Sequence, residues 1–292
     1  MAQPPPDRVG LAGLGTMGLP IARRLVAGGI KLGVWNRSLG PAALLADDGA
    51  LVDDSFAALL DSHDIVLLML FDEAAADAVL GRADDTLGVD VSGKLIVQMG
   101  TTSLESSRAL QHAIAAGGGR YVEAPISGSR IPAERGELVA MMAGAAADKA
   151  RVAPLFGHFT TATVDCGAVP QALAMKLASN LLLGPIMVGL VDATAFARRA
   201  GLDMTLFADV ILGGQMASPI IRAKMAKLLA DDHSPHAAIG NVILSAGTAL
   251  DAATALGLDQ TLLRSCFDRF VAAADAGLAD EDVTALDKML RQ

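Results

Sequence analysis

In the first half of the chain, short runs of apolar residues alternate with longer amphipathic segments rich in alanine and leucine. Each apolar run has the length of a strand and is followed by a polar or glycine-containing turn. The expected strands cover residues 9–13, 31–35, 65–70, 95–99, 121–124 and 138–143. Strands that alternate with helices in this way predict an α/β Rossmann fold, a doubly wound, largely parallel sheet with helices on both faces.

The strand pattern stops near Asp165, and the remaining residues have helical periodicity only. Residues 170–199 form one long helix-compatible stretch in which Gly184-Pro185 marks a place for a kink. Further helices are expected at 203–212, 217–230, 237–256, 259–276 and 283–290, and C-cap glycines at Gly201, Gly257 and Gly277. We therefore expect a Rossmann domain at 1–165 and an all-helical domain at 166–292, joined by the long helix.

Composition limits the possible partners of this chain. Hydrophobic residues make up 52% of its 292 residues and charged residues 19%, which excludes a disordered chain. A net charge of −9 and 3% aromatic residues argue against nucleic acid as a partner. Residues 1–8 lack the apolar stretch of a signal peptide, and the uncharged run 181–191 is short for a membrane span. Two cysteines and five scattered histidines predict neither disulfides nor a metal site, so we expect a cytoplasmic protein.

The strongest motif lies between the first expected strand and the first helix. It reads Gly13-Leu14-Gly15-Thr16-Met17-Gly18 and matches GxGxxG in its required strand-turn-helix context. Gly13 allows a tight turn, Gly15 the close approach of a pyrophosphate, and Gly18 contact between helix and strand. The helix N-terminus adds N–H donors and partial positive charge, so the motif predicts a bound dinucleotide.

The second expected strand ends in Asn36-Arg37-Ser38, where sites that prefer NAD usually carry an acidic residue for the ribose hydroxyl. Arg37 can pair with a 2′-phosphate, and Ser38 can donate a hydrogen bond to it. The pattern favours NADP(H). The alternative interpretation is an ordinary surface arginine that follows a strand.

Two further groups of residues suggest chemistry at a carbonyl. Lys176 and Asn180 are four residues apart on the long apolar helix, so they project from one face. Such a lysine could act as a general acid that protonates the alkoxide formed by hydride transfer, or could simply extend its ammonium to water. Ser127, with the N–H groups of Gly128 and Ser129, follows a strand and could receive a substrate carboxylate, although a plain loop fits as well.

These motifs together resemble the β-hydroxyacid dehydrogenase family, over about residues 9–277. The extended run GGRYVEAPISGSR at 118–130, continued by Pro132-Ala133-Glu134, is most similar to the glyoxylate/succinic semialdehyde reductase branch. The resemblance implies an NAD(P)-dependent enzyme that acts on a small-molecule substrate, with Lys176 as catalytic lysine, Asn180 as its helper and Ser127 with Gly128 as carboxylate-binding loop. It further implies that Met69, Leu70 and Thr101 line the nicotinamide and its ribose. It also implies a homodimer or homotetramer joined through the helical domain.

The chain departs from the family pattern in three places, which keeps other functions open. Leu244 and Ser245 stand where the family commonly has a Lys-Asp pair, so a cation is missing from the expected cleft. Pro170 and Ala172 replace two glycines before the catalytic lysine, and Gln98 replaces an aspartate. The main expectation is an NADPH-dependent reductase of a small aldehyde or keto acid. An imine reductase with a more apolar substrate is the alternative, and a non-catalytic NADP-binding scaffold is a third.

Overall fold

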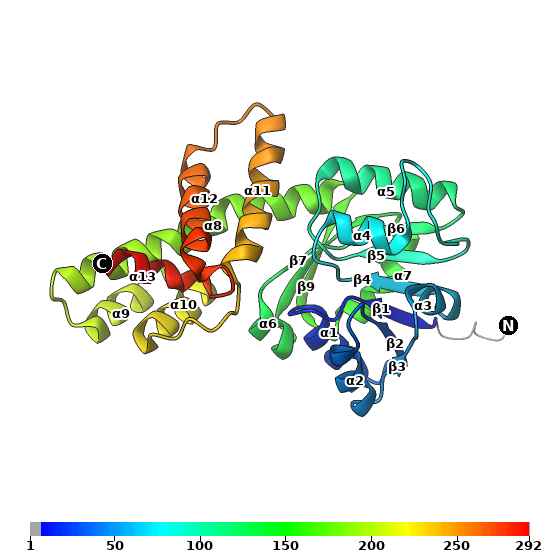
Figure 1. Cartoon of the computed structure of the whole chain (residues 1–292), viewed down its shortest axis with the longest axis horizontal. Coiled ribbons are helices and arrows are strands. Elements are labelled where there is room, and N and C mark those ends of the chain that lie inside the picture. Colours follow the sequence, from blue (N-terminus) through cyan, green and yellow to red (C-terminus); the bar gives the residue numbers. More distant parts are fainter. Residues whose placement is uncertain (1–6, 292) are drawn as a thin grey trace. The chain divides into compact units, whose positions relative to one another are not determined.

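The computed structural model describes residues 7–291, which form two compact units that meet in sequence between Lys176 and Leu177. Figure 1 shows a mixed α/β unit followed by a unit built from helices. We describe each unit by itself.

A nine-stranded sheet organises the first unit. Its strands are β1 (Val9–Ala12), β2 (Leu32–Trp35), β3 (Leu51–Val52), β4 (Ile65–Leu68), β5 (Leu95–Gln98), β6 (Arg120–Glu123), β7 (Ile126–Ser127), β8 (Leu138–Gly144) and β9 (Thr160–Gly167). The strand order is β3-β2-β1-β4-β5-β6-β8-β7, and β9 pairs with β8. Strands β1 to β6 are all parallel, whereas β8 runs antiparallel to β6 and β7. The expected doubly wound sheet is confirmed.

Helices cover both faces of this sheet. They are α1 (Gly18–Ala27), α2 (Leu39–Asp47), α3 (Phe56–Ser62), α4 (Glu73–Leu80), α5 (Leu104–Ala116), α6 (Arg130–Arg135) and α7 (Ala146–Phe156). Successive residues of a strand point to opposite faces, and in β4 Ile65 and Leu67 join one apolar core while Val66 and Leu68 join the other. Because both faces are buried, the central strands are continuous apolar runs, which made them visible in the sequence.

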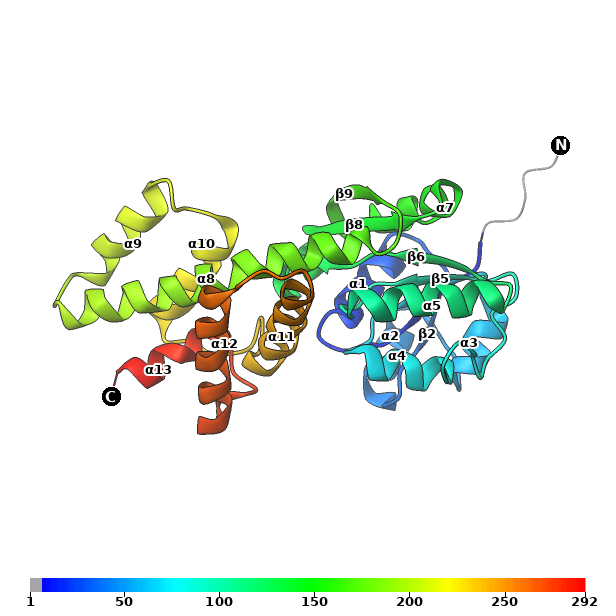
Figure 2. The same ribbon diagram turned by 90° about the horizontal axis from the view of Figure 1, so that it is seen from above.

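The second unit is helical throughout its described residues. It contains most of α8 (Gln171–Arg199), then α9 (Met204–Gly213), α10 (Pro219–Ala230), α11 (Ile239–Ala255), α12 (Thr261–Ala273), η1 (Ala274–Leu278), η2 (Val283–Ala285) and α13 (Leu286–Leu290). Figure 2 shows α9 and α10 beside the C-terminal part of α8, where Leu190 packs with Ala208 and Met225. Positive φ angles at Gly201, Gly257 and Gly277 confirm the glycines expected at helix ends.

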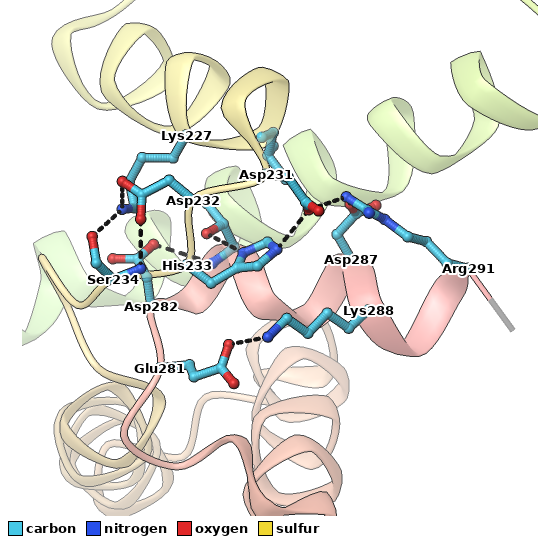
Figure 3. Close-up of polar contacts among 12 residues, drawn as sticks. Lys227, Asp231, Asp232, His233, Ser234, Glu281, Asp282, Asp287, Lys288 and Arg291 are labelled. Carbon is cyan, nitrogen blue, oxygen red and sulfur yellow. Dashed lines mark hydrogen bonds and ion pairs between the residues drawn. The ribbon is translucent and has the colours of Figure 1, made fainter.

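A network of ion pairs and hydrogen bonds joins the last segments of the second unit (Figure 3). Both carboxylate oxygens of Asp282 accept hydrogen bonds from the buried Lys224 ammonium, at 2.8 and 2.7 Å. Asp282 also accepts the backbone N–H groups of His236 and Ala237. His233 lies between Thr284 and Asp231, and so takes part in this packing. The Asp282 carboxylate, which lies just before η2, thus binds both α10 and the segment that follows α10.

Helix α8 is long and apolar enough to cross a membrane, judged by length and composition alone. Leu173, Leu177, Leu190 and Val191 on this helix are nevertheless buried within the chain, as they are in core helices. Other apolar side chains of α8 are largely exposed, among them Leu182 and Phe196. Some apolar side chains of α8 therefore lie in the core of this chain, and others lie on its surface.

Candidate functional site

The glycine-rich turn connects β1 to α1 at the carboxyl edge of the parallel sheet. Gly13 has φ +96° and donates its N–H to the carbonyl oxygen of Trp35 at 3.0 Å. A Cβ on Gly13 would lie 2.3 Å from the carbonyl oxygen of Met69, and one on Gly18 would lie 1.8 Å from the carbonyl oxygen of Gly13. The protein's own backbone therefore requires glycine at both positions.

Gly15 differs from its two neighbours in the motif. A Cβ on Gly15 would meet no protein atom within 4 Å, and Gly15 and Thr16 are exposed. The fold therefore gives no steric reason for glycine at this position. A ligand that approaches the backbone closely would require glycine at this position, and the N-terminus of α1 favours an anionic ligand. The turn thus fits the pyrophosphate of a dinucleotide.

Asn36 holds this turn against the end of β2. Its Oδ1 accepts the N–H of Leu14 at 2.9 Å, and its Nδ2 donates to the carbonyl oxygen and to Oγ of Ser38, each at 2.9 Å. Both amide protons are thus used within the protein. Asn36 fixes the shape of the cofactor loop, while Arg37 and the hydroxyl of Ser38 keep donors suited to a phosphate.

Arg37 lines a pocket of about 240 Å³ next to the end of β2. The other lining residues are Trp35, Asn36, Leu39, Ala42, Val52, Asp53, Asp54 and Ser55. Asp53 and Asp54 add negative charge to the same pocket, and the pKa of Asp53 is raised because the carboxyl is partly desolvated. These carboxylates follow β3, whose two apolar residues are too short a run to predict a strand, so no sequence pattern placed them beside Arg37.

Met69, Leu70 and Thr101 lie in the segments that follow β4 and β5. The N–H of Met69 donates to the carbonyl oxygen of Ala12 at 2.9 Å, which joins the end of β4 to the end of β1. The structure therefore brings Met69 next to Gly13. The crevice beyond these adjacent strand ends is where open α/β sheets bind ligands.

Lys176 lies in the second turn of α8 and is half-buried. Burial lowers the pKa of its ammonium to about 8, because a less hydrated site disfavours the charged form. An ammonium with this pKa is protonated at neutral pH and can still release a proton to a strongly basic alkoxide.

Asn180 follows Lys176 by one helical turn and is only 7% exposed. Its Nδ2 has no hydrogen-bond partner among residues 7–291. Burial of an unpaired amide is costly, and this cost is removed when a ligand accepts the hydrogen bond. The two side chains of α8 thus offer a proton donor and a neutral donor on one face of the helix.

The loop that follows β7 is open to solvent and offers unused hydroxyl groups. Ser127 pairs with Val139 of β8 through its backbone, and Gly128 has φ +133°. Neither Ser127 Oγ nor Ser129 Oγ makes a hydrogen bond within residues 7–291, and Ser129 precedes α6 without capping it. Two hydroxyl donors beside a glycine fit a carboxylate ligand.

Glu123 is a buried residue to which the sequence analysis gave no role. It lies at the end of β6, and its Oε1 accepts the N–H of Leu173, in the first turn of α8, at 2.7 Å. Its Oε2 accepts a hydrogen bond from Ser107 Oγ, which lies 3.1 Å from the Tyr121 hydroxyl. Burial raises the pKa of Glu123, and these hydrogen bonds oppose that change.

No group of three or more His, Cys, Asp or Glu side chains within residues 7–291 is arranged to hold a metal ion. His63 packs against Asp53, and His233 belongs to the network in Figure 3.

Two family models together match nearly the whole chain. The NAD-binding domain of 6-phosphogluconate dehydrogenase matches residues 8–167, and the NAD-binding domain of NADP-dependent 3-hydroxyisobutyrate dehydrogenase matches residues 171–290. Glyoxylate/succinic semialdehyde reductase 1 of Arabidopsis thaliana is 29% identical over 278 residues, which cover 95% of this chain and 96% of the relative.

Solved structures share the fold over almost the same length. A 3-hydroxyisobutyrate dehydrogenase from Salmonella typhimurium has a TM-score of 0.85 and 26% identity, and the match covers 96% of this chain and 99% of that one. An imine reductase from Pseudomonas sp. has a TM-score of 0.64 and 21% identity, with 98% and 100% covered.

Proposed function

Because the chain belongs to the β-hydroxyacid dehydrogenase family, an NAD(P)-dependent group of enzymes, we propose that it reduces a small aldehyde or keto acid with NADPH. Glyoxylate and succinic semialdehyde represent the substrate class, as in the name of the plant relative. The observation that carries the proposal is the half-buried Lys176, whose pKa of about 8 suits proton donation to a new alkoxide.

When bound, NADPH would supply the hydride for the carbonyl carbon of the substrate. The residues of the chain bind both molecules and supply the proton. Lys176 stabilises the negative charge that develops on the carbonyl oxygen and protonates that oxygen. Asn180 donates a hydrogen bond to the substrate near the same oxygen. Ser127 Oγ and Ser129 Oγ bind the carboxylate and thereby orient the aldehyde.

The pH dependence of reduction should follow the protonation of Lys176. Because the reaction needs the ammonium, kcat/KM should be constant well below pH 8 and should fall about tenfold per pH unit above it. Oxidation of the hydroxy acid needs the neutral amine, and its rate should rise through the same pKa. A pH profile of initial rates in both directions measures this. A reduction rate that stays level to pH 10 would contradict the assigned role.

Arg37 supports NADPH as the preferred cofactor. Arg37→Ala should raise the KM for NADPH about 10- to 100-fold, because a charge-assisted contact to the 2′-phosphate is lost, and should leave that for NADH nearly unchanged. Steady-state kinetics with both cofactors measure the effect. Arg23→Ala, an exposed arginine of α1 paired with Asp48, is the control. Equal changes for NADPH and NADH would mean that Arg37 does not contact the phosphate.

An imine reductase is the second candidate, because α11 has no basic side chain and carries Leu244 and Ser245 where the family commonly has a Lys-Asp pair. Leu244 is partly exposed, and Ser245 donates to the carbonyl oxygen of Val242 in its own helix. Rates with glyoxylate, succinic semialdehyde and a cyclic imine, each with NADPH and NADH, separate the two candidates. Turnover of the imine alone would favour the second, and cofactor binding without turnover would favour a scaffold.

A homodimer or homotetramer joined through the helical unit is also part of the proposal. Phe196 of α8 and Leu206 and Val210 of α9 are largely exposed apolar residues, and such patches commonly lie at subunit contacts. Sedimentation equilibrium measures the assembly. A cytoplasmic location stays a prediction.

A further inference from the structure

Helix α8 begins without a capping side chain of its own. The N–H groups in the first turn of a helix have no partner within the helix and need one from elsewhere. Pro170, the residue before α8, has no side-chain acceptor, and Gln171 and Ala172 come next. The usual Ser, Thr, Asp or Asn is therefore missing at the start of the helix that carries Lys176.

Glu123 supplies the missing acceptor from the sheet. Its Oε1 accepts the N–H of Leu173 at 2.7 Å across 50 positions of sequence, and both residues are fully buried. A carboxylate also suits the partial positive charge at a helix N-terminus. The end of β6 is thereby joined to the first turn of α8.

The carboxyl group of Glu123 is held from its other side as well. Oε2 accepts a hydrogen bond from Ser107 Oγ of α5, and the Tyr121 hydroxyl lies 3.1 Å from the same Oγ. A buried group with partners on both oxygens has little freedom to move. The position of α8 is thus set against both β6 and α5.

We propose that Glu123 is a positioning residue for the reaction, since it caps α8 and so fixes the height of Lys176 above the edge of the sheet. Leu173 precedes Lys176 by three residues, about 4.5 Å along the helix axis. The Glu123 carboxylate binds the backbone of α8 at Leu173, so its proposed effect on Lys176 is an effect on position. The inference rests on the proposed function of Lys176.

Two substitutions at position 123 separate positioning from charge. Glu123→Leu removes the acceptor and leaves the Leu173 N–H buried without a partner, so kcat should fall about 10- to 100-fold, because small displacements of a catalytic group are costly. Glu123→Gln keeps a carbonyl oxygen for the same N–H and should retain kcat within about threefold. Both variants should keep wild-type values of the substrate KM and of the Kd for NADPH. The pH near 8 above which kcat/KM begins to fall should also stay close to that of the wild type. Ser218→Ala, which removes the side-chain cap of α10 and leaves α8 untouched, is the matched control and should keep kcat at the wild-type value.

Hydrogen exchange followed by NMR tests the cap without any turnover. In the wild type the Leu173 amide should exchange slowly, although first-turn amides of helices usually exchange fast. Glu123→Leu should remove this protection within residues 171–176 only. If Glu123→Leu does not fold, fast exchange of Leu173 in the wild type would still overturn the proposal.

The cap on α8 and the proposed reaction can be rejected independently. A protected Leu173 amide in an enzyme that reduces no carbonyl would leave the cap in place and reject the proposed reaction. Full activity in Glu123→Leu, or equal losses in the Gln and Leu variants, would overturn the positioning role.

Discussion

Replacing Lys176 by alanine should lower kcat for carbonyl reduction by about 10²- to 10⁴-fold, the usual contribution of a positioned general acid. The Kd for NADPH should stay within about twofold of wild type, because Lys176 lies on α8 and outside the glycine-rich turn. Lys176→Arg should be impaired to a similar degree, since a guanidinium keeps its proton at neutral pH and so supplies charge without proton donation.

Steady-state NADPH oxidation and fluorescence titration of the cofactor measure the two quantities. Lys31→Ala, an exposed lysine before β2, is the matched control and should behave like wild type. If Lys176→Ala turned over within threefold of wild type, the reaction would not use this lysine. If Lys176→Arg were fully active, the residue would act through its charge alone.

Gly15→Ala should raise the Kd for NADPH about 10- to 100-fold and leave the thermal stability of the cofactor-free protein unchanged. The added methyl group meets no protein atom within 4 Å, so the fold tolerates it. It does occupy the space that a pyrophosphate needs above the turn. If Gly15→Ala weakens NADPH binding and leaves the cofactor-free fold unchanged, the cofactor lies at Gly15.

Gly18→Ala provides the contrast. Its Cβ would lie 1.8 Å from the carbonyl oxygen of Gly13, so the turn must shift even without cofactor and Tm should fall. Thermal unfolding and cofactor titration of both variants test this difference. Unchanged NADPH affinity in Gly15→Ala would place the dinucleotide elsewhere.

The central sheet could be predicted because its strands are buried on both faces and therefore form plain apolar runs. Three strands were missed because they lack a long buried apolar run. β3 is exposed and two residues long, β7 has two residues, and β9 carries exposed threonines in place of an apolar run. β9 also extends the sheet to Gly167, beyond the boundary expected at residue 165.

Candidate site residues that belong to one local motif could be predicted from the sequence. Those that depend on contacts between distant segments could not. The glycine turn, Arg37 and the pair Lys176 and Asn180 each follow from one motif or one helical spacing. The cap that Glu123 places on Leu173 joins residues 50 positions apart, and no local pattern marks it. Asp53 and Asp54 likewise enter the pocket of Arg37 only through the pairing of β2 with β3.

Transfer of deuterium from NADPH labelled at C4 of the nicotinamide shows whether the protein reduces a carbonyl group by hydride transfer. We expect glyoxylate or succinic semialdehyde to yield the hydroxy acid with deuterium at the former carbonyl carbon, seen by mass spectrometry, and Lys176→Ala to form this product far more slowly. NADPH consumption without a labelled hydroxy acid, or label found only in an amine made from an imine, would contradict this expectation.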